Sequence, residues 1–430
     1  MNDVLTPALL QPLVPPPLPA TVASRMEFAN ARPQYRRLVM RGALLELITV
    51  GFYRFWLATD MRRHLWSHTS VEGDAPEYTG TGKELLIGFL FALAIIVPLN
   101  VGYFLLGLEA ARLKAFASVP LVVLYYLFWQ FATYRARRYR LTRTVWRGVR
   151  FSMGGSGLNY CWRAALWSLF SVVTLGLALP WRQAALERFK MRYTAYGNLA
   201  GQFEATGGQL FRRGWGLWLI SWLMVAGLAA IVTWTVFVMM EVQAAGRVPP
   251  QNLAIKGITA MVITTIASTA VQVAAPFILA MYRSIEWRWW ISGIRFGEVG
   301  FESDMSRGRL IGLYWKVIGW SLLMWVLFSA WTVAVVFIAR SQIGDVPEVQ
   351  KMMLATQHPV FYAGIGVAYV IGILAFWTVT RIYMIHDVWN RVASSVTVYN
   401  LASAVDVVEQ GQLASALGEG LADSLDVAGF

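Results

Sequence analysis

The sequence predicts an all-α, polytopic membrane protein with about six transmembrane helices, two re-entrant or interfacial hairpins and an internal parallel repeat. Composition is the first reason. Of the 430 residues, 57% are hydrophobic and 14% are charged, whereas an average soluble domain has about 25% charged residues. The second reason is that one stretch occurs twice: residues 48–56 read ITVGFYRFW and residues 173–181 read VTLGLALPW. Repeated halves in an apolar chain are typical of multipass membrane proteins.

A transmembrane helix needs about 20 mostly apolar residues. Six segments meet this requirement: residues 85–108, 116–133, 214–240, 257–281, 310–339 and 360–380. Two further apolar stretches are unusual, because residues 38–58 contain charges and residues 166–181 are short. Both contain the signature T-x-G-x-x-x-x-W. Its residues are Thr49, Gly51 and Trp56 in the first stretch and Thr174, Gly176 and Trp181 in the second, where Pro180 precedes the Trp.

The distribution of Lys and Arg predicts how these two stretches are placed. If only the six long segments cross, with both termini cytoplasmic, the outer loops hold six of the 37 Lys and Arg residues, in agreement with the positive-inside rule. The basic segments 134–163 and 182–213 then both lie inside, although they flank the short stretch at 166–181. We therefore expect residues 38–58 and 166–181 to be hairpins that return to the inner face. Eight complete spans are the alternative.

The offset of 125 residues between the two signatures also predicts the domain organisation. Residues 25–139 form membrane repeat one and residues 140–290 form repeat two. Residues 291–400 form a degenerate third unit, which lacks the signature. Residues 1–24 contain six Pro and no Lys or Arg, which predicts a disordered tail, and residues 401–430 form an acidic C-terminal tail.

No catalytic, cofactor or metal site is predicted. Residues 80–84 read GTGKE, but Glu77 and Glu84 replace the Gly and the Ser or Thr that a phosphate-binding loop requires. Asp60, His64 and His68 are spaced by four, as for a metal site on one helix face. The second unit has Ala185, Phe189 and Tyr193 at these positions, so we expect a solvated helix face. His386 and Asp387 have no evident partner. We therefore expect a protein that is not an enzyme.

Charged residues inside apolar stretches are candidate functional residues. Glu46 and Arg54 lie in the first hairpin, and Lys316 lies near the start of the fifth span, where we expect it to extend to the inner surface. A second group mixes Arg with aromatic residues. We expect it to face anionic lipid headgroups rather than nucleic acid: Arg137, Arg138, Arg140, Trp287, Arg288, Trp289 and Trp290.

Three motifs follow one another in the first unit: T-x-G-x-Y-x-x-W at residues 49–56, Arg62-Arg63, and Y-x-G-x-G-x-E-L-L at residues 78–86. Arg150-Phe151 and T-L-G-x-x-x-P-W at residues 174–181 repeat part of this order in the second unit. In this order the sequence resembles the YjgN-like bacterial inner-membrane proteins. The resemblance implies a multipass protein of the bacterial inner membrane, in a family with no assigned function. It supplies no catalytic residues.

Two hypotheses for function remain. The first is a transporter or channel for a small solute, in which Thr49, Gly51, Thr174 and Gly176 line a cavity between the two hairpins. The alternative is a membrane scaffold or anionic-lipid-interacting protein without transport activity, which uses the Arg-rich and Trp-rich inner face. In both hypotheses the expected partners are membrane lipids, with a homo-oligomer as a further option and no nucleic acid.

Overall fold

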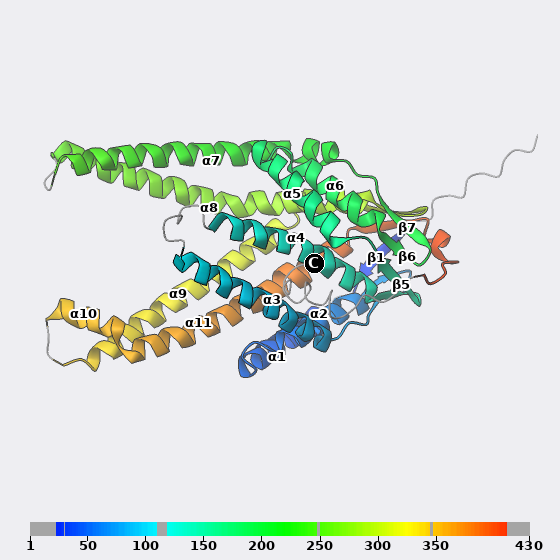
Figure 1. The fold of residues 1–430 in the computed structure, drawn as a ribbon, viewed down its shortest axis with the longest axis horizontal. Coiled ribbons are helices and arrows are strands. Elements are labelled where there is room, and N and C mark those ends of the chain that lie inside the picture. Colours follow the sequence, from blue (N-terminus) through cyan, green and yellow to red (C-terminus); the bar gives the residue numbers. More distant parts are fainter. Residues whose placement is uncertain (1–22, 30, 110–117, 247–249, 345–346, 411–430) are drawn as a thin grey trace, which may run out of the picture.

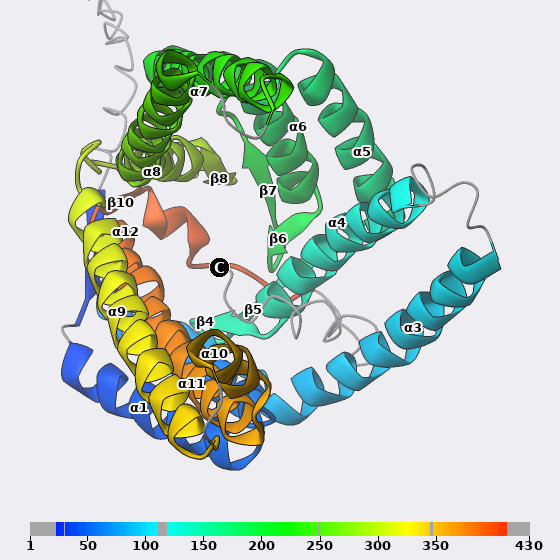
Figure 2. The same cartoon turned by 90° about the vertical axis from the view of Figure 1, so that its left-hand side faces the viewer.

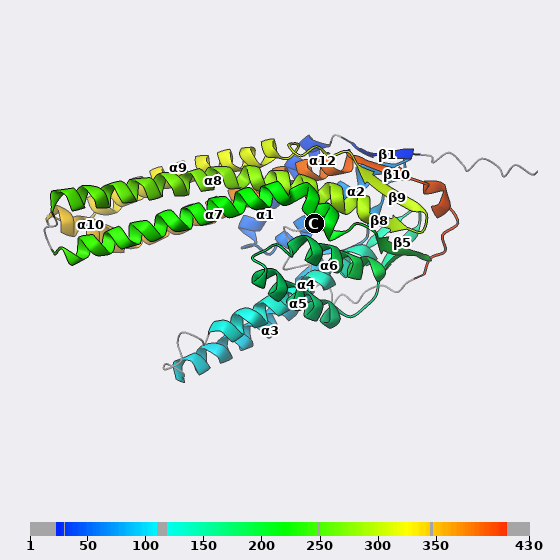
Figure 3. The same ribbon diagram turned by 90° about the horizontal axis from the view of Figure 1, so that it is seen from above.

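The computed structural model describes residues 23–29, 31–109, 118–246, 250–344 and 347–410. Most of the predicted tail at 1–24, and the part of the acidic tail after residue 410, lie outside these residues. Figure 1 shows that the strands gather at one end of the molecule and that long helices extend from them. Seen from above, in Figure 3, the pair α3 and α4 diverges from the other long helices.

The strands form one antiparallel sheet, so the prediction of an all-α fold is wrong. Within the described residues the sheet has ten strands in the order β2-β1-β10-β9-β8-β7-β6-β5-β4-β3. Most of these strands have only two to five residues, which is too short to show the alternation that reveals a strand in a sequence. The strands are β1 (Ala23–Phe28), β2 (Thr69–Val71), β3 (Glu77–Tyr78), β4 (Thr144–Trp146), β5 (Val149–Met153), β6 (Thr194–Tyr196), β7 (Leu199–Phe203), β8 (Ile294–Phe296), β9 (Val299–Ser303) and β10 (Val396–Tyr399).

Helices connect the strands in pairs. Four short helices form two hairpins: α1 (Arg32–Ile48) with α2 (Arg54–Ser67), and α5 (Gly157–Val173) with α6 (Leu179–Arg192). The long helices are α3 (Gly82–Glu109), α4 (Ser118–Thr142), α7 (Gly207–Ala244), α8 (Gln251–Gly293), α9 (Ile311–Ser341) and α11 (Pro359–Thr380). The remaining elements are α10 (Glu348–Gln357), the π-helix η2 (Arg381–Asp387), α12 (Val388–Ala393) and the 3-10 helix η3 (Leu401–Ala404).

This order gives five successive units in the described chain, each a strand, a helix pair and a strand. The two strands of every unit are neighbours in the sheet, and β1 of the first unit pairs with β10 of the last. Figure 2 shows the helix pairs arranged around the curved sheet. The edge strands β2 and β3 are consecutive in the chain and are joined by residues 72–76. The sheet is therefore an open, barrel-like ring whose gap lies between β2 and β3.

Tight two-residue turns join β4 to β5, β6 to β7 and β8 to β9. Each turn contains a glycine in the left-handed region: Gly148 at φ 76°, Gly197 at 52° and Gly297 at 57°. Glycine adopts this conformation without the steric cost of a Cβ atom. These glycines therefore allow the chain to return directly from one unit to the next.

Five helical segments of the described chain are long and apolar enough to cross a membrane, so the prediction of six is wrong. They are Gly82–Phe104, Gly207–Ala244, Gln251–Gly293, Ile311–Ser341 and Pro359–Ala393. The predicted segment 116–133 falls in α4. The C-terminal half of α4 carries Arg135, Arg137, Arg138 and Arg140, so its described apolar part is short.

The largest hydrophobic core lies at the sheet end of the molecule. Ile291 at the end of α8 and Leu313 at the start of α9 pack with Val299 and Val398 of the sheet. Leu401 of η3 joins the same core. Farther from the sheet, most side chains of the five apolar segments are not buried within the protein. The packing of the sheet end therefore fixes where the apolar helices start and finish.

Candidate functional site

The two T-x-G-x-x-x-x-W segments form the turns of the hairpins α1–α2 and α5–α6. Two consecutive residues in each turn have left-handed φ: Val50 and Gly51 at 52° and 88°, and Leu175 and Gly176 at 50° and 83°. The amide of each Gly donates a 2.7 Å hydrogen bond to the carbonyl oxygen five residues earlier. This is a Schellman-type helix end, which favours Gly because the backbone is left-handed. The chain therefore reverses at both signatures and returns to the sheet.

The signature Thr side chains are used within these turns. Thr49 Oγ1 donates to the Leu45 carbonyl oxygen at 2.7 Å and accepts from the Tyr53 amide at 2.9 Å. Thr174 Oγ1 donates to a carbonyl at 2.9 Å and accepts from the Ala178 amide at 3.2 Å. Each Thr thus links the last turn of one helix to the first turn of the next.

The signature Trp residues fix the start of the next long helix. A Cβ atom on Gly82, the first residue of α3, would lie 2.8 Å from Trp56. A Cβ atom on Gly207, the first residue of α7, would lie 2.6 Å from the backbone of Trp181. Only glycine permits the helix start to lie this close to the Trp without displacing either one. Trp56 and Gly82 are therefore one contact that recurs as Trp181 and Gly207.

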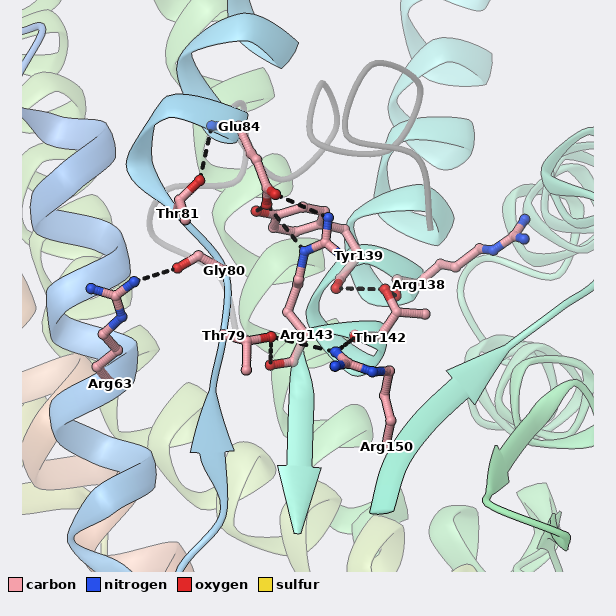
Figure 4. Close-up of polar contacts among 10 residues, drawn as sticks. All are labelled: Arg63, Thr79, Gly80, Thr81, Glu84, Arg138, Tyr139, Thr142, Arg143 and Arg150. Carbon is pink, nitrogen blue, oxygen red and sulfur yellow. Dashed lines mark hydrogen bonds and ion pairs between the residues drawn. The ribbon is translucent and has the colours of Figure 1, made fainter. Parts of the chain in front are cut away.

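The motif Y-x-G-x-G-x-E-L-L joins α2, α3 and α4 beside the sheet, as Figure 4 shows. The Glu84 carboxylate accepts two hydrogen bonds from the Arg143 guanidinium, both at 3.1 Å, and one from the Tyr139 hydroxyl. Arg63 of α2 donates to the Gly80 carbonyl oxygen at 2.8 Å. The bidentate contact of Arg143 and the backbone contact of Arg63 thus hold the start of α3 between α2 and α4. The Glu84 carboxylate of this motif is thus engaged by Arg143 and Tyr139.

Glu46, one of the predicted intramembrane charges, forms a buried ion pair with Arg381 of η2. The carboxylate accepts two 2.8 Å hydrogen bonds from the guanidinium, and the two side chains are 4% and 6% exposed. Arg54 does not pair with Glu46 and lies 4.6 Å from the Phe89 ring. Lys316 lies 5.9 Å from an aromatic ring of η2.

Asp387, for which the sequence shows no evident partner, pairs with Arg32 at the start of α1. Two guanidinium nitrogens donate to the two carboxylate oxygens at 3.0 Å each. Between these ion pairs, the Tyr35 hydroxyl donates to the Arg381 carbonyl oxygen at 3.3 Å. Helix α1 is thus tied to η2 by Arg32 and Tyr35 in its first turn and by Glu46 in its last turn.

Three His side chains gather beside Tyr35, between α1, α2 and η2. The Tyr35 ring lies 5.4 Å from the His64 ring and 4.7 Å from the His386 ring. His64 and His68 stack at 4.1 Å. His386 is completely buried, and its Nδ1 lies 2.9 Å from Asp387 Oδ1. Within the described residues, Nε2 of His64 and Nε2 of His386 are buried without a hydrogen-bond partner.

The spacing of Asp60, His64 and His68 does not produce a cluster of three ligands. Asp60 lies 3.8 Å from Arg63 on its own helix, whereas His64 packs against Tyr35 and His68 stacks on His64. In the part of the chain that the structure describes, no group of three His, Cys, Asp or Glu side chains is placed to hold a metal ion.

The second hairpin borders a cavity of about 710 Å³ between α5–α6 and α7–α8. Gly176 and Pro180 of the signature line it, and Thr174 is not among its lining residues. Most of the other lining side chains are apolar or aromatic. The positively charged side chain in this lining is that of Arg182, whose Nε donates to the Ser168 hydroxyl at 2.9 Å. Within the described residues, Arg182 has no ion pair with a carboxylate.

The basic and aromatic residues expected at the lipid headgroups are placed mainly inside the sheet end. Trp289 is 2% exposed, and its Nε1 donates to the Thr206 carbonyl oxygen at 3.0 Å. Arg137 pairs with Glu187 at 2.7 Å and lies 5.9 Å from the Trp290 ring. Trp287, Arg138 and Arg140 are partly buried, and Arg288 is exposed. The reason is that β4 and β8 follow α4 and α8 directly, so these helix ends pack against the sheet.

The partnerships of Arg381 with Glu46 and of Arg32 with Asp387 are not evident in the sequence. Glu46 and Arg381 are 335 residues apart, and Arg32 and Asp387 are 355 residues apart. No local sequence pattern indicates a contact between residues so far apart in the chain. The available signal was the row of ionisable residues that directly follows the last apolar run, at positions 381–391.

Comparison with protein families matches residues 23–424 to the family described as bacterial protein of unknown function (DUF898). No curated protein and no solved structure matches the chain. The match covers all of the described residues and agrees with the resemblance to YjgN-like proteins. The chain therefore belongs to this bacterial family, and its five apolar helical segments mark it as an integral membrane protein.

Proposed function

We propose that the protein binds anionic membrane lipid at the α5–α6 hairpin, as a non-catalytic lipid-interacting protein of the bacterial inner membrane. The observation that carries this proposal is the cavity beside the second hairpin. Its lining combines apolar side chains from α5, α6 and α7 with a single Arg. An acyl chain fits such walls, and a phosphate fits the guanidinium.

Arg182 supplies the chemical specificity of this proposal. A guanidinium in an apolar cavity is costly unless an anion accompanies it. Its described side-chain partner is the neutral Ser168 hydroxyl. The phosphate of a phospholipid provides the charge that Ser168 lacks, and the remaining guanidinium nitrogens provide donors for it. This favours an anionic lipid over an uncharged solute.

The hairpin turns support a position at the membrane surface. Val172 and Val173 before the second turn are each 72% exposed, and Val50 in the first turn is 88% exposed. Exposed apolar turns of this kind are stabilised when they enter the hydrocarbon and return to the side from which they came. In this arrangement the hairpins are the two copies of an internal repeat, each with its Trp and Gly contact.

The distribution of charge supports an orientation with the sheet in the cytoplasm. All five helix pairs begin and end at the sheet. The turns at the opposite ends of the long helices contain six of the 37 Lys and Arg residues, and the cytoplasmic side of inner-membrane proteins is the basic side. With this orientation Arg182 meets the cytoplasmic leaflet.

Lipid retention by purified protein tests the proposal. The protein in nanodiscs that contain equal amounts of phosphatidylglycerol and phosphatidylcholine, with matched acyl chains, is transferred to detergent and examined by native mass spectrometry. We expect the wild type to retain phosphatidylglycerol. Arg182→Gln should lower this retention about tenfold or more, because a charge-assisted hydrogen bond to a phosphate is lost.

Two variants separate the headgroup from the acyl chain. Arg192→Gln alters an exposed Arg of the same helix outside the cavity and should leave retention unchanged. Gly214→Leu places a side chain in the cavity, where a Cβ atom first meets Tyr282 at 3.8 Å, and should displace both lipids. Equal retention by wild type and Arg182→Gln would refute the proposed headgroup contact.

A further inference from the structure

The junction of α1 and α2 with η2 contains titratable groups that neither the hairpin turns nor the lipid cavity uses. Helix α1 is tied to η2 by Glu46 with Arg381 and by Asp387 with Arg32. The π-helix η2 follows α11 without a break. π-Helical turns are rare and occur frequently at functional sites. The junction thus connects the first hairpin to the base of the last apolar helix.

The acids of the two ion pairs already have partners. Glu46 is satisfied by Arg381, and Asp387 by Arg32 and by His386 Nδ1. The charges of the two pairs cancel while the His rings are neutral. The titratable and charged groups around His64 and His386 are Arg32, Tyr35 and Glu46 from α1, Arg54, Asp60 and His68 from α2, Arg381, Tyr383 and Asp387 from η2, and Arg391 from α12.

The geometry assigns the proton-accepting atoms. A His whose Nδ1 donates to a carboxylate carries its lone pair on Nε2. In His386 this Nε2 is buried and has no partner within the described residues, and the same is true of Nε2 of His64. A proton on Nε2 of His64 places a positive charge on a partly buried ring that packs against Tyr35 and His68, which carries a desolvation cost.

We propose that this junction is a proton-sensitive latch, in which protonation of His64 releases the α1–α2 hairpin from η2. The ligand is the proton. Opening the junction exposes the His64 ring to water, where the added charge is hydrated. At neutral pH the His64 ring is neutral and the latch is closed, and acidification opens it.

The sign of the pH dependence follows from His64. Burial, followed by the charges of His68 and His386, lowers the pKa of His64 from 6.5 to about 4, against the opposing effect of a hydrogen bond with the Ala31 backbone. The closed junction therefore binds fewer protons than the open one between pH 6.5 and pH 4. By linkage, the stability that neutral His64 gives the closed form is complete above pH 6.5 and decreases as the pH falls toward 4. Between pH 7.5 and pH 5 the shift is on the order of tenfold after allowance for solvent screening.

Hydrogen–deuterium exchange of the full chain in nanodiscs tests the latch. Exchange times are scaled to the intrinsic exchange rate at each pH, so that only protection is compared. We expect the protection of α1 to fall on the order of tenfold between pH 7.5 and pH 5. The α5 peptide is an internal control, since Phe189 occupies the position of His64 in that hairpin.

Variants decide whether His64 is responsible. His64→Phe installs the residue of the second hairpin and should remove most of the response of α1. His358→Gln alters the His at the start of α11, away from the junction, and should leave the response intact. A wild-type α1 with equal protection at both pH values, or a full response in His64→Phe, overturns the proposal.

Discussion

The two short hairpins share one backbone design and carry different chemistry. Both reverse at a T-x-G turn, and both present a buried Tyr from the first helix to a ring on the second. In the first hairpin Tyr35 lies 5.4 Å from His64, whereas in the second Tyr160 lies 6.0 Å from Phe189. The position of Glu46 is taken by Ser171. The fold therefore tolerates either ionisable or neutral residues at the same sites, and the difference indicates that the two hairpins have separate roles.

Removing the buried carboxylate should produce the largest difference between the hairpins. Glu46→Gln leaves Arg381 buried without its anion, which typically costs about 3–5 kcal/mol. Ser171→Ala removes one neutral hydrogen bond to the Trp167 carbonyl oxygen and should cost about 1 kcal/mol or less. Unfolding by SDS titration in mixed micelles measures both.

A second variant sharpens this prediction. In Glu46→Ser with Arg381→Leu both charges are removed together, so most of the lost stability should return, because a buried ion pair replaced as a whole is often nearly neutral. If Glu46→Gln alone costs no more than Ser171→Ala, the ion pair does not distinguish the two hairpins.

The Trp and Gly contact should give equal effects in the two hairpins. Gly82→Ala and Gly207→Ala each force a Cβ atom to within 3 Å of a Trp, and overpacking of this kind costs about 1–3 kcal/mol. Gly208→Ala is the matched control, since a Cβ atom there meets nothing within 4 Å. The same titration reports all three. A large effect at Gly207 with none at Gly82 would show that the hairpins dock on their spans differently.

The smallest effect is expected in the second hairpin on mild acidification. Burial alone would raise the pKa of Glu187, but the charges of Lys190 and Arg137 outweigh it and lower this pKa to about 2. The stability that Glu187 contributes is complete above pH 4.5 and is lost only as the pH falls toward 2. Hydrogen exchange of α6 should therefore be unchanged between pH 7.5 and pH 5, and increased exchange of α6 at pH 5 would contradict this assignment.

The sequence contains enough information to locate the hairpins and most apolar helices. The repeated Thr, Gly and Trp positions predict two matched reversals, and the structure places both turns at these residues. That the turns enter a membrane stays a prediction. The sixth apolar run, residues 116–133, does not qualify because its described part begins at Ser118 and the Arg residues from Arg135 to Arg140 follow it directly in α4.

The sheet could not be predicted from local patterns. A strand such as Thr144–Trp146 is too short for a period of two to appear, and its neighbours are set by contacts across the whole chain. One signal was present. Trp146, Tyr196 and Phe296 each precede a two-residue turn that contains Gly, which is typical of β-hairpins. Because no strands are expected from the sequence, Trp289 is predicted to lie at the lipid headgroups, whereas the structure buries it beside the sheet.

The pairing of the first strand with the last has a consequence for biosynthesis. Ala23 lies opposite Tyr399, and a ribosome adds about 5–20 residues per second, so β1 waits roughly 20–75 s for its partner. During that interval β2 can cover one edge of β1, while the other edge remains open and able to pair with another chain. Nascent chains that stop before β10 keep this edge. Of the described strands, the last to be synthesised is therefore the one that protects the first from aggregation.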